Sequence, residues 1–169
     1  MKRRSATSSP KPPEPTFFTD RDLEKTFPRL LRESGLRVER YADHFEEQNV
    51  PDQEWIAFAA RNRWVAVSHD RNIKSDPIAI RTAMEEGARL FIVRGKHLTG
   101  PDKARLFLDA QKLIARVLAR QGSEAFIATV RRLALQGGIF KADVEVSLTL
   151  QQWMQGRGIA PPESEDLEI

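Results

Sequence analysis

The sequence predicts an α/β fold, in which a small, mainly parallel sheet of about five strands is flanked by helices in a three-layer arrangement. Two observations predict this class. Short apolar segments of strand character alternate with segments of helical periodicity, which is typical of a parallel sheet with helical crossovers. The chain has 169 residues, of which 40% are hydrophobic, and this length supports one domain with one substantial core.

Composition excludes several classes of function. The chain has no cysteine, which excludes a disulfide framework, a thiolate zinc site and a cysteine nucleophile. The 27 Lys and Arg residues against 24 Asp and Glu residues leave a net charge of only +3, so nucleic-acid binding depends on the positions of charges rather than on their total. No apolar run is long enough for an export signal or a membrane span, so the cytoplasm is the expected location.

The two ends of the chain are predicted to lie outside the folded domain. Residues 1–15 are rich in Ser, Pro and Lys and are expected to form a disordered basic arm. Residues 156–169 contain Pro161-Pro162 and four acidic residues and are expected to form an acidic tail. The main domain is predicted over 16–132, followed by an appendage over 133–155 whose pattern leaves its structure open.

The first half of this domain alternates strands with helices. A helix is predicted to begin at Pro28, which is tolerated in a first helical turn, and to end at Gly35. Residues 23–27 then form an approach turn. A second helix is predicted from Pro51 to Arg63. The predicted strands of this half are Thr16–Thr19, Leu36–Tyr41 and Val65–Ser68.

The second half repeats the same alternation. One helix is predicted from Pro77 to Gly87, and one longer helix from Pro101 to Gly122. Further along, a Gly-Gly pair predicts a turn, and alternating apolar residues after it resemble a strand. The predicted strands of this half are residues 90–93 and 126–130.

Acidic residues follow the predicted strands at the point where each strand ends. Asp20 and Asp22 follow the first strand, Asp70 follows the third, and Asp52 and Glu54 open the helix between the second and third. In an open α/β sheet these ends share one edge, where ligands bind. The sequence therefore predicts a carboxylate cluster at that edge.

Such a cluster calls for a cation. Two like charges at ~4 Å repel by about 4 kcal/mol at an effective dielectric constant near 20, so several converging carboxylates need a counter-charge. An all-oxygen site favours Mg²⁺ or Mn²⁺ over zinc. These ions polarise phosphoryl oxygens and activate water, which predicts metal-assisted hydrolysis of phosphodiesters or phosphate esters.

Each acidic residue also has a structural interpretation. Asp22 is suited to cap the turn after it, while Asp52 and Glu54 lie in a first helical turn, where acidic residues favour the helix dipole. For these three residues taken singly, the structural interpretation is favoured. Asp20 and Asp70 are expected to have no capping role, and burial makes each of them costly unless something binds it. These two residues are therefore predicted to be functional.

Basic residues follow the same strand ends. Arg71, Lys74, Arg21 and Lys96 are candidates to hold phosphate groups, with Arg71 first among them. His69 precedes Asp70, and strand alternation is expected to place the two side chains on opposite faces. His69 is therefore predicted to be a packed, hydrogen-bonded residue rather than a ligand or general base.

The order and spacing of these motifs resemble the PIN-like nuclease domains, and within them a branch of the VapC-type toxins of type II toxin–antitoxin modules. The resemblance spans roughly residues 16–132. The motifs that carry it are Phe17-Phe18-Thr19-Asp20-Arg21-Asp22-Leu23, Phe27-Pro28, Pro51-Asp52-Gln53-Glu54-Trp55 and Val67-Ser68-His69-Asp70-Arg71-Asn72-Ile73.

This resemblance implies a PIN-like three-layer fold and a toxin that cleaves single-stranded RNA with water activated by Mg²⁺ or Mn²⁺. It implies Asp20 and Asp70 as metal ligands, with Asp52 in the middle position and Glu54 as its alternative. Asp22 or Glu54 would orient the water. The implied partners are the RNA substrate, a cognate antitoxin protein and a second copy in a homodimer.

The chain also departs from the family pattern. Asn72 stands where many PIN-like domains carry a further acidic residue after the third strand, and Arg94-Gly95-Lys96 stands where many carry one after the fourth. An amide oxygen can ligate a metal but adds no charge, so Asn72 predicts either a weaker metal site or compensation by Asp22.

Two other hypotheses remain open at this point. Asp20-Arg21-Asp22 is a DxD motif after a first strand, as in haloacid-dehalogenase-like phosphatases, although Glu24 stands where those enzymes have Thr or Val. A receiver-like phospho-acceptor would use the same pair with Asp70. Alternatively, the chain is a degenerate PIN-like module that binds RNA or a protein without catalysis.

Overall fold

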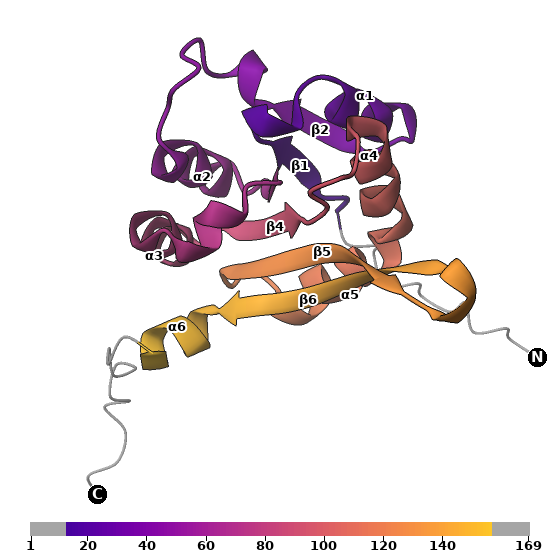
Figure 1. Ribbon diagram of the computed structural model, residues 1–169. Coiled ribbons are helices and arrows are strands. Elements are labelled where there is room, and N and C mark those ends of the chain that lie inside the picture. Colours follow the sequence, from indigo (N-terminus) through magenta and orange to yellow (C-terminus); the bar gives the residue numbers. More distant parts are fainter. Residues whose placement is uncertain (1–12, 157–169) are drawn as a thin grey trace, which may run out of the picture.

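The computed structural model describes residues 13–156, so most of the predicted arm and tail lie outside the described residues. The sheet has six strands in the order β2-β1-β3-β4-β5-β6, with β6 antiparallel and the others parallel (Figure 1). The α/β class is confirmed, and the sheet has one strand more than expected. The strands are β1 Thr16–Thr19, β2 Arg37–Arg40, β3 Val65–Ser68, β4 Arg89–Val93, β5 Phe126–Ala134 and β6 Phe140–Thr149.

Helices cover both faces of this sheet, which gives the three layers. Short 3-10 turns follow four of the strands, and those after β1 and β3 hold several residues of the candidate site. The α-helices are α1 Thr26–Glu33, α2 Asp52–Arg61, α3 Pro77–Glu86, α4 Gly100–Asp109, α5 Gln111–Gln121 and α6 Leu150–Gly156. The 3-10 turns are η1 Arg21–Leu23, η2 Tyr41–Asp43, η3 Arg71–Ser75 and η4 Gln136–Gly138.

Two cores lie on opposite faces of the sheet. Phe17 belongs to the core under α1, α4 and α5, where its ring meets Phe107 edge to face at 5.3 Å. The next residue, Phe18, belongs to the core under α2 and α3, where it stacks on Trp55. Adjacent side chains of a strand point to opposite faces, so a strand covered on both sides is apolar throughout. Burying each ring contributes roughly 1.5–3 kcal/mol.

Two predicted helices differ from the observed ones. Helix α1 begins at Thr26, two residues before Pro28, because a proline within the first turn removes no intrahelical hydrogen bond. The predicted long helix is two helices separated at Ala110, whose backbone has φ −84° and ψ 0°. Neither glycine nor proline marks this break, so the apolar stripe continued across it in the sequence.

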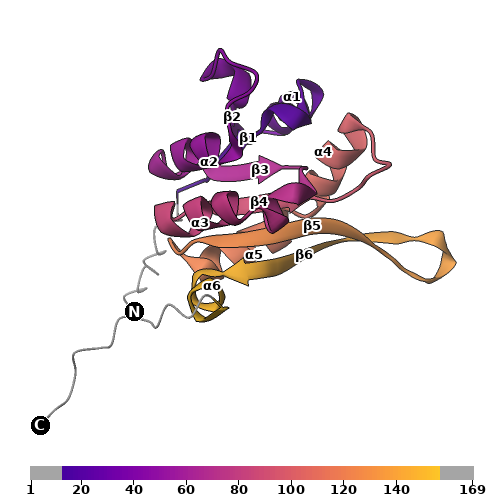
Figure 2. The ribbon, with the colours of Figure 1, turned by 60° about the vertical axis from the view of Figure 1, so that its left-hand side comes forward.

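The segment after residue 132 belongs to the same sheet. Strand β5 continues to Ala134, and β6 pairs with it from Phe126↔Thr149 to Ala134↔Phe140. The hairpin turns at Gly137 and Gly138, both at positive φ, and its tip projects past the carboxyl ends of the parallel strands (Figures 1 and 2). Within residues 13–156, no helix is long and apolar enough to cross a bilayer.

Candidate functional site

Asp20 lies at the carboxyl end of β1 and is 2% exposed. Its Oδ1 accepts a hydrogen bond of 2.7 Å from the Arg21 amide, and its Oδ2 accepts one of 2.9 Å from Ser68 Oγ. The expectation that Asp20 has no capping role is wrong, because the chain enters η1 directly after β1 and presents an amide that needs an acceptor. The carboxyl group is nevertheless far more buried than a cap requires.

Burial of the side chain, and then the charge of the neighbouring Asp22, raise the pKa of the Asp20 carboxyl to about 8. The Ser68 hydroxyl and the Arg21 amide act in the opposite direction, because they stabilise the carboxylate. Without a counter-charge, Asp20 therefore keeps its proton at neutral pH. A cation beside Asp20 and Asp22 would displace that proton.

Ser68 also connects Asp20 to Asp70. Its Oγ accepts a hydrogen bond of 3.1 Å from the Asp70 amide while donating to Asp20. The parallel register, in which Thr19 pairs with Val67, places the two strand ends side by side. Asp70 Oδ1 in turn accepts a hydrogen bond of 2.9 Å from the Asn72 amide and so caps η3. The expectation that Asp70 has no capping role is therefore wrong as well.

A cavity of about 290 Å³ opens at this edge. Asp22 and Asp70 provide its acidic side, whereas Asp20 lies in the wall of another cavity, of about 520 Å³, beside Arg21 and Glu24. Basic and polar groups provide the rest of the smaller cavity. Its remaining lining residues are His69, Arg71, Asn72, Val93, Arg94, Gly95, Lys96 and Lys103.

His69 lines the same cavity as Asp70, so the predicted separation of the two side chains is wrong. Strand β3 ends at Ser68, and strand alternation no longer applies at the next two residues. Lys103 Nζ lies 2.9 Å from His69 Nδ1, and His69 Nε2 lies 3.7 Å from Asp22 Oδ2. Burial and then Lys103 lower the pKa of His69. Because a lysine only donates, the neutral ring carries its proton on Nε2, facing Asp22.

Asp52 and Glu54 line neither cavity. Asp52 Oδ1 accepts a hydrogen bond of 2.9 Å from the indole of fully buried Trp55, and Glu54 is exposed. Within the described part of the chain, no group of three or more His, Cys, Asp or Glu side chains could hold a metal. The structure therefore does not gather Asp20, Asp52 and Asp70 into the predicted set of three.

The four predicted phosphate-binding residues separate into two pairs. Arg71 and Lys96 line the cavity beside the acidic residues. Arg21 instead donates hydrogen bonds to the carbonyls of Gln48 and Val50. Lys74 donates to the hydroxyls of two residues on β5 and β6, Thr129 and Ser147.

Two further cations of the cavity were not predicted as site residues. Arg94 follows β4 directly and was visible in the sequence as part of Arg94-Gly95-Lys96. Lys103 is half-buried in the first turn of α4, and no sequence signal distinguishes it from the other lysines of the chain. Only the packing of α4 over the strand ends brings Lys103 to His69.

The donor set fits a hard divalent cation. Mg²⁺ keeps several waters and is bound through one or two carboxylates together with phosphate oxygens, which is the kind of donor that Asp22 and Asp70 provide in one cavity. An α/β sheet with a buried carboxyl group and further acidic residues at its carboxyl edge, and cations beside them, is the arrangement of a hydrolase that acts on phosphate esters.

Comparison with known proteins identifies the family within this class. The family described as "PIN like domain" matches residues 15–95. A Mycobacterium tuberculosis protein named "Putative ribonuclease VapC45" is 34% identical over 118 residues, which cover 68% of this chain and 84% of that relative. The chain therefore belongs to the PIN-like domain family, in its VapC-type branch. No solved structure matches the chain.

Proposed function

We propose that this protein is a metal-dependent endoribonuclease that acts as the toxin of a toxin–antitoxin module. The observation that carries the proposal is the buried Asp20 carboxyl, joined through Ser68 to Asp70 at the carboxyl edge of a PIN-like sheet. Burying an ionisable carboxyl group beside a second carboxylate destabilises the fold unless a ligand compensates it. If the protein is a VapC-type ribonuclease, the compensating ligand is the divalent cation that it uses for cleavage.

In this proposal Asp20, Asp22 and Asp70 hold Mg²⁺ or Mn²⁺. A cation bound there would polarise the scissile phosphate and lower the pKa of the attacking water. Arg71 and Lys96, which line the same cavity as Asp22 and Asp70, bind the phosphate groups of the substrate. His69, held by its contact with Lys103, lies beside Asp22, with 3.7 Å between His69 Nε2 and Asp22 Oδ2.

The partners follow from this assignment. The substrate is single-stranded RNA, and a cognate antitoxin protein restrains the toxin. The absence of cysteine from the chain agrees with action in the cytoplasm. Assembly of two copies into a homodimer stays a prediction, which the solution mass of the purified protein would test.

The experiment is cleavage of a labelled single-stranded RNA with Mg²⁺ or Mn²⁺ and with a chelator. Asp20→Asn and Asp70→Asn are expected to reduce the rate by about 100-fold or more, within the range seen when a major electrostatic group is lost. The matched control is Glu124→Gln, which removes an exposed carboxylate between α5 and β5, outside the cavities at the carboxyl edge. Cleavage by Asp20→Asn and Asp70→Asn at the original rate would show that the site is wrong.

One observation favours a second candidate, a PIN-like module that binds without cleaving. The described residues provide no group of three metal-ligating side chains, and Asn72 occupies a position where related domains carry an acidic residue. Calorimetry separates the two candidates. Heat of binding at millimolar Mg²⁺ or Mn²⁺ that Asp20→Asn abolishes supports the nuclease, whereas no binding supports the module.

A further inference from the structure

A second cavity, of about 440 Å³, shares a wall with the cavity beside Asp70. Arg71, Arg94, Gly95 and Lys96 line both cavities. The second cavity continues over the loop after β4 to the β5–β6 hairpin, and its remaining lining residues are His97, Leu98, Arg131 and Arg132. The two cavities therefore form one continuous surface from the acidic residues to the hairpin.

Most cations of this surface have no acidic partner. Arg71, Arg94, Lys96 and Arg132 are exposed, and none of them forms a salt bridge with a residue in the described range. Arg131 is different, because it pairs with Asp143 and Glu145 across the hairpin at 2.9 and 2.8 Å. A row of unpaired cations favours a polyanion.

The hairpin lengthens this surface beyond the body of the sheet. Val130 pairs with Val93, the last residue of β4, and β5 continues for four more residues to Ala134. At about 3.4 Å per residue this extension is roughly 14 Å long. Figures 1 and 2 show the hairpin projecting past the carboxyl edge, beside α4.

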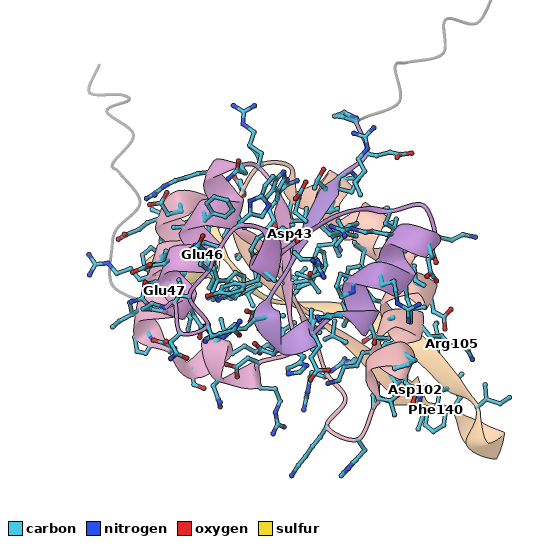
Figure 3. The ribbon with its side chains drawn as sticks, turned by 90° about the horizontal axis from the view of Figure 1, so that it is seen from above. Asp43, Glu46, Glu47, Asp102, Arg105 and Phe140 are labelled. Atoms are coloured by element: carbon cyan, nitrogen blue, oxygen red, sulfur yellow. The ribbon has the colours of Figure 1, made fainter. Side chains whose placement is uncertain are left out.

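The extension carries an aromatic side chain next to a cation. The guanidinium of Arg132 lies over the Phe140 ring at 4.8 Å, and Phe140 is 59% exposed. Figure 3 shows Phe140 close to Asp102 and Arg105 of α4, which line one cavity together with Arg132 and Phe140. An exposed aromatic ring with an adjacent arginine is the kind of platform on which bases of single-stranded nucleic acid stack.

Apolar residues at the tip of the hairpin suit a different ligand, a protein partner. Exposed large apolar side chains of the described residues gather on this hairpin, at Leu133, Leu135, Ile139 and Phe140, with Ile78 elsewhere. A protein partner would suit them. Such a partner would leave the four unpaired cations uncompensated, whereas RNA accounts for those cations and for the platform together.

We propose that the β5–β6 hairpin is a substrate-binding arm, on which single-stranded RNA continues from the acidic cavity across Arg94 and Lys96 to Arg132 and Phe140. This inference rests on the proposed ribonuclease function and adds to it a second contact region. The arm lies beyond the acidic cavity in which the scissile bond would be bound. A long strand can reach both places, so the arm adds to its affinity, whereas a short strand bound in the cavity gains little from the arm.

The test measures binding in chelator, where no cleavage occurs. Fluorescence anisotropy follows labelled oligouridine of about six and about twelve nucleotides, which brackets the span of a single-strand site. The variants are Arg132→Ala, Phe140→Ala and the double variant. Matched controls are Lys112→Ala and Arg116→Ala, exposed cations of α5 away from both cavities.

The double variant is expected to weaken binding of the longer strand by about tenfold or more, with about a twofold change for the shorter one. Arg132→Ala is also expected to reduce the slope of log affinity against log salt by about 0.7, the value for one single-strand phosphate contact. Phe140→Tyr keeps the ring and is expected to bind normally. This conservative variant separates stacking from a loss of hairpin structure.

Several outcomes decide the inference. Unchanged binding of the longer strand by a double variant that still cleaves RNA overturns the arm and leaves the nuclease standing. Unchanged RNA binding with a smaller mass in solution assigns the hairpin to an interface with a second copy and also overturns it. Length-dependent loss of binding in a protein that never cleaves RNA keeps the arm and overturns the nuclease.

Discussion

Ser68 Oγ donates a hydrogen bond of 2.9 Å to Asp20 Oδ2, and both side chains are buried between the ends of β1 and β3. The same oxygen accepts from the Asp70 amide. One hydroxyl group therefore positions both of the acidic residues that the sequence predicted to be functional. Its removal would disturb the ionisation of Asp20 and the placement of both residues.

Ser68→Ala is expected to raise the pKa of Asp20 further, since the hydroxyl stabilises the carboxylate. Metal-dependent cleavage at neutral pH should then fall by about tenfold, because one pKa unit changes the charged fraction by that factor. The pH–rate profile should move to higher pH, and activity should recover there. Ser75→Ala, an exposed control in η3, should leave the profile in place. An unshifted profile for Ser68→Ala would contradict the assignment.

The stability of the metal-free protein is expected to depend on Asp20. Its pKa is 3.8 ordinarily and about 8 in the folded protein, so the folded state holds this proton more tightly. The resulting stabilisation is complete below about pH 4 and is lost as the pH rises through about 8. Since one pKa unit corresponds to about 1.4 kcal/mol, the free energy of unfolding should fall by a few kcal/mol over this pH range.

Urea denaturation in chelator between about pH 5 and pH 9 measures this fall. Asp20→Asn cannot ionise and should lose much less stability over the same range. Added divalent cation should restore the free energy of unfolding of the wild-type protein most strongly at high pH, because the cation takes the place of the proton that Asp20 has lost. Equal losses in the wild type and in Asp20→Asn would show that another group governs the pH dependence.

Asp52 is expected to be a structural residue. Asp52→Ala leaves the buried Trp55 indole without its acceptor, which should lower the free energy of unfolding by about 1–3 kcal/mol. Asp52→Asn keeps an acceptor oxygen and should cost less. Cleavage per folded molecule should stay within about twofold of wild type, since the group lies outside the cavity. Loss of cleavage by a stable Asp52→Asn would make Asp52 a ligand after all.

Lys74 and Arg71 are expected to behave differently, although both follow β3. Lys74 donates to Thr129 and Ser147, and burial lowers its pKa, so Lys74→Ala should cost about 1 kcal/mol of stability. Its RNA affinity should be unchanged. Arg71→Ala should keep its stability and lose affinity, with a lower salt dependence. Thermal unfolding and RNA binding at two salt concentrations distinguish these outcomes.

Strands and strand ends could be predicted wherever the local pattern was unambiguous. The apolar runs of β1 and β3 end at polar residues, and their predicted bounds, 16–19 and 65–68, agree with the structure. The break at Ala110 had no signal, because an apolar stripe without glycine or proline continues through it. The long β5–β6 hairpin also escaped prediction, although it is a local pairing. The alternating residues after Gly137-Gly138 continue into Gln151-Gln152 without a clear strand end, and strand preference depends on tertiary context.

For the site, the sequence by itself determined that Asp20 and Asp70 lie together, because residues after parallel strands meet at one edge of the sheet. Only the tertiary structure decided which other side chains join them. The packing of α4 brings Lys103 to His69, and the Trp55 indole holds Asp52 away from the cavity. These choices depend on how helices pack against the sheet, and a periodic pattern shows which face of a helix is buried without showing what that face meets.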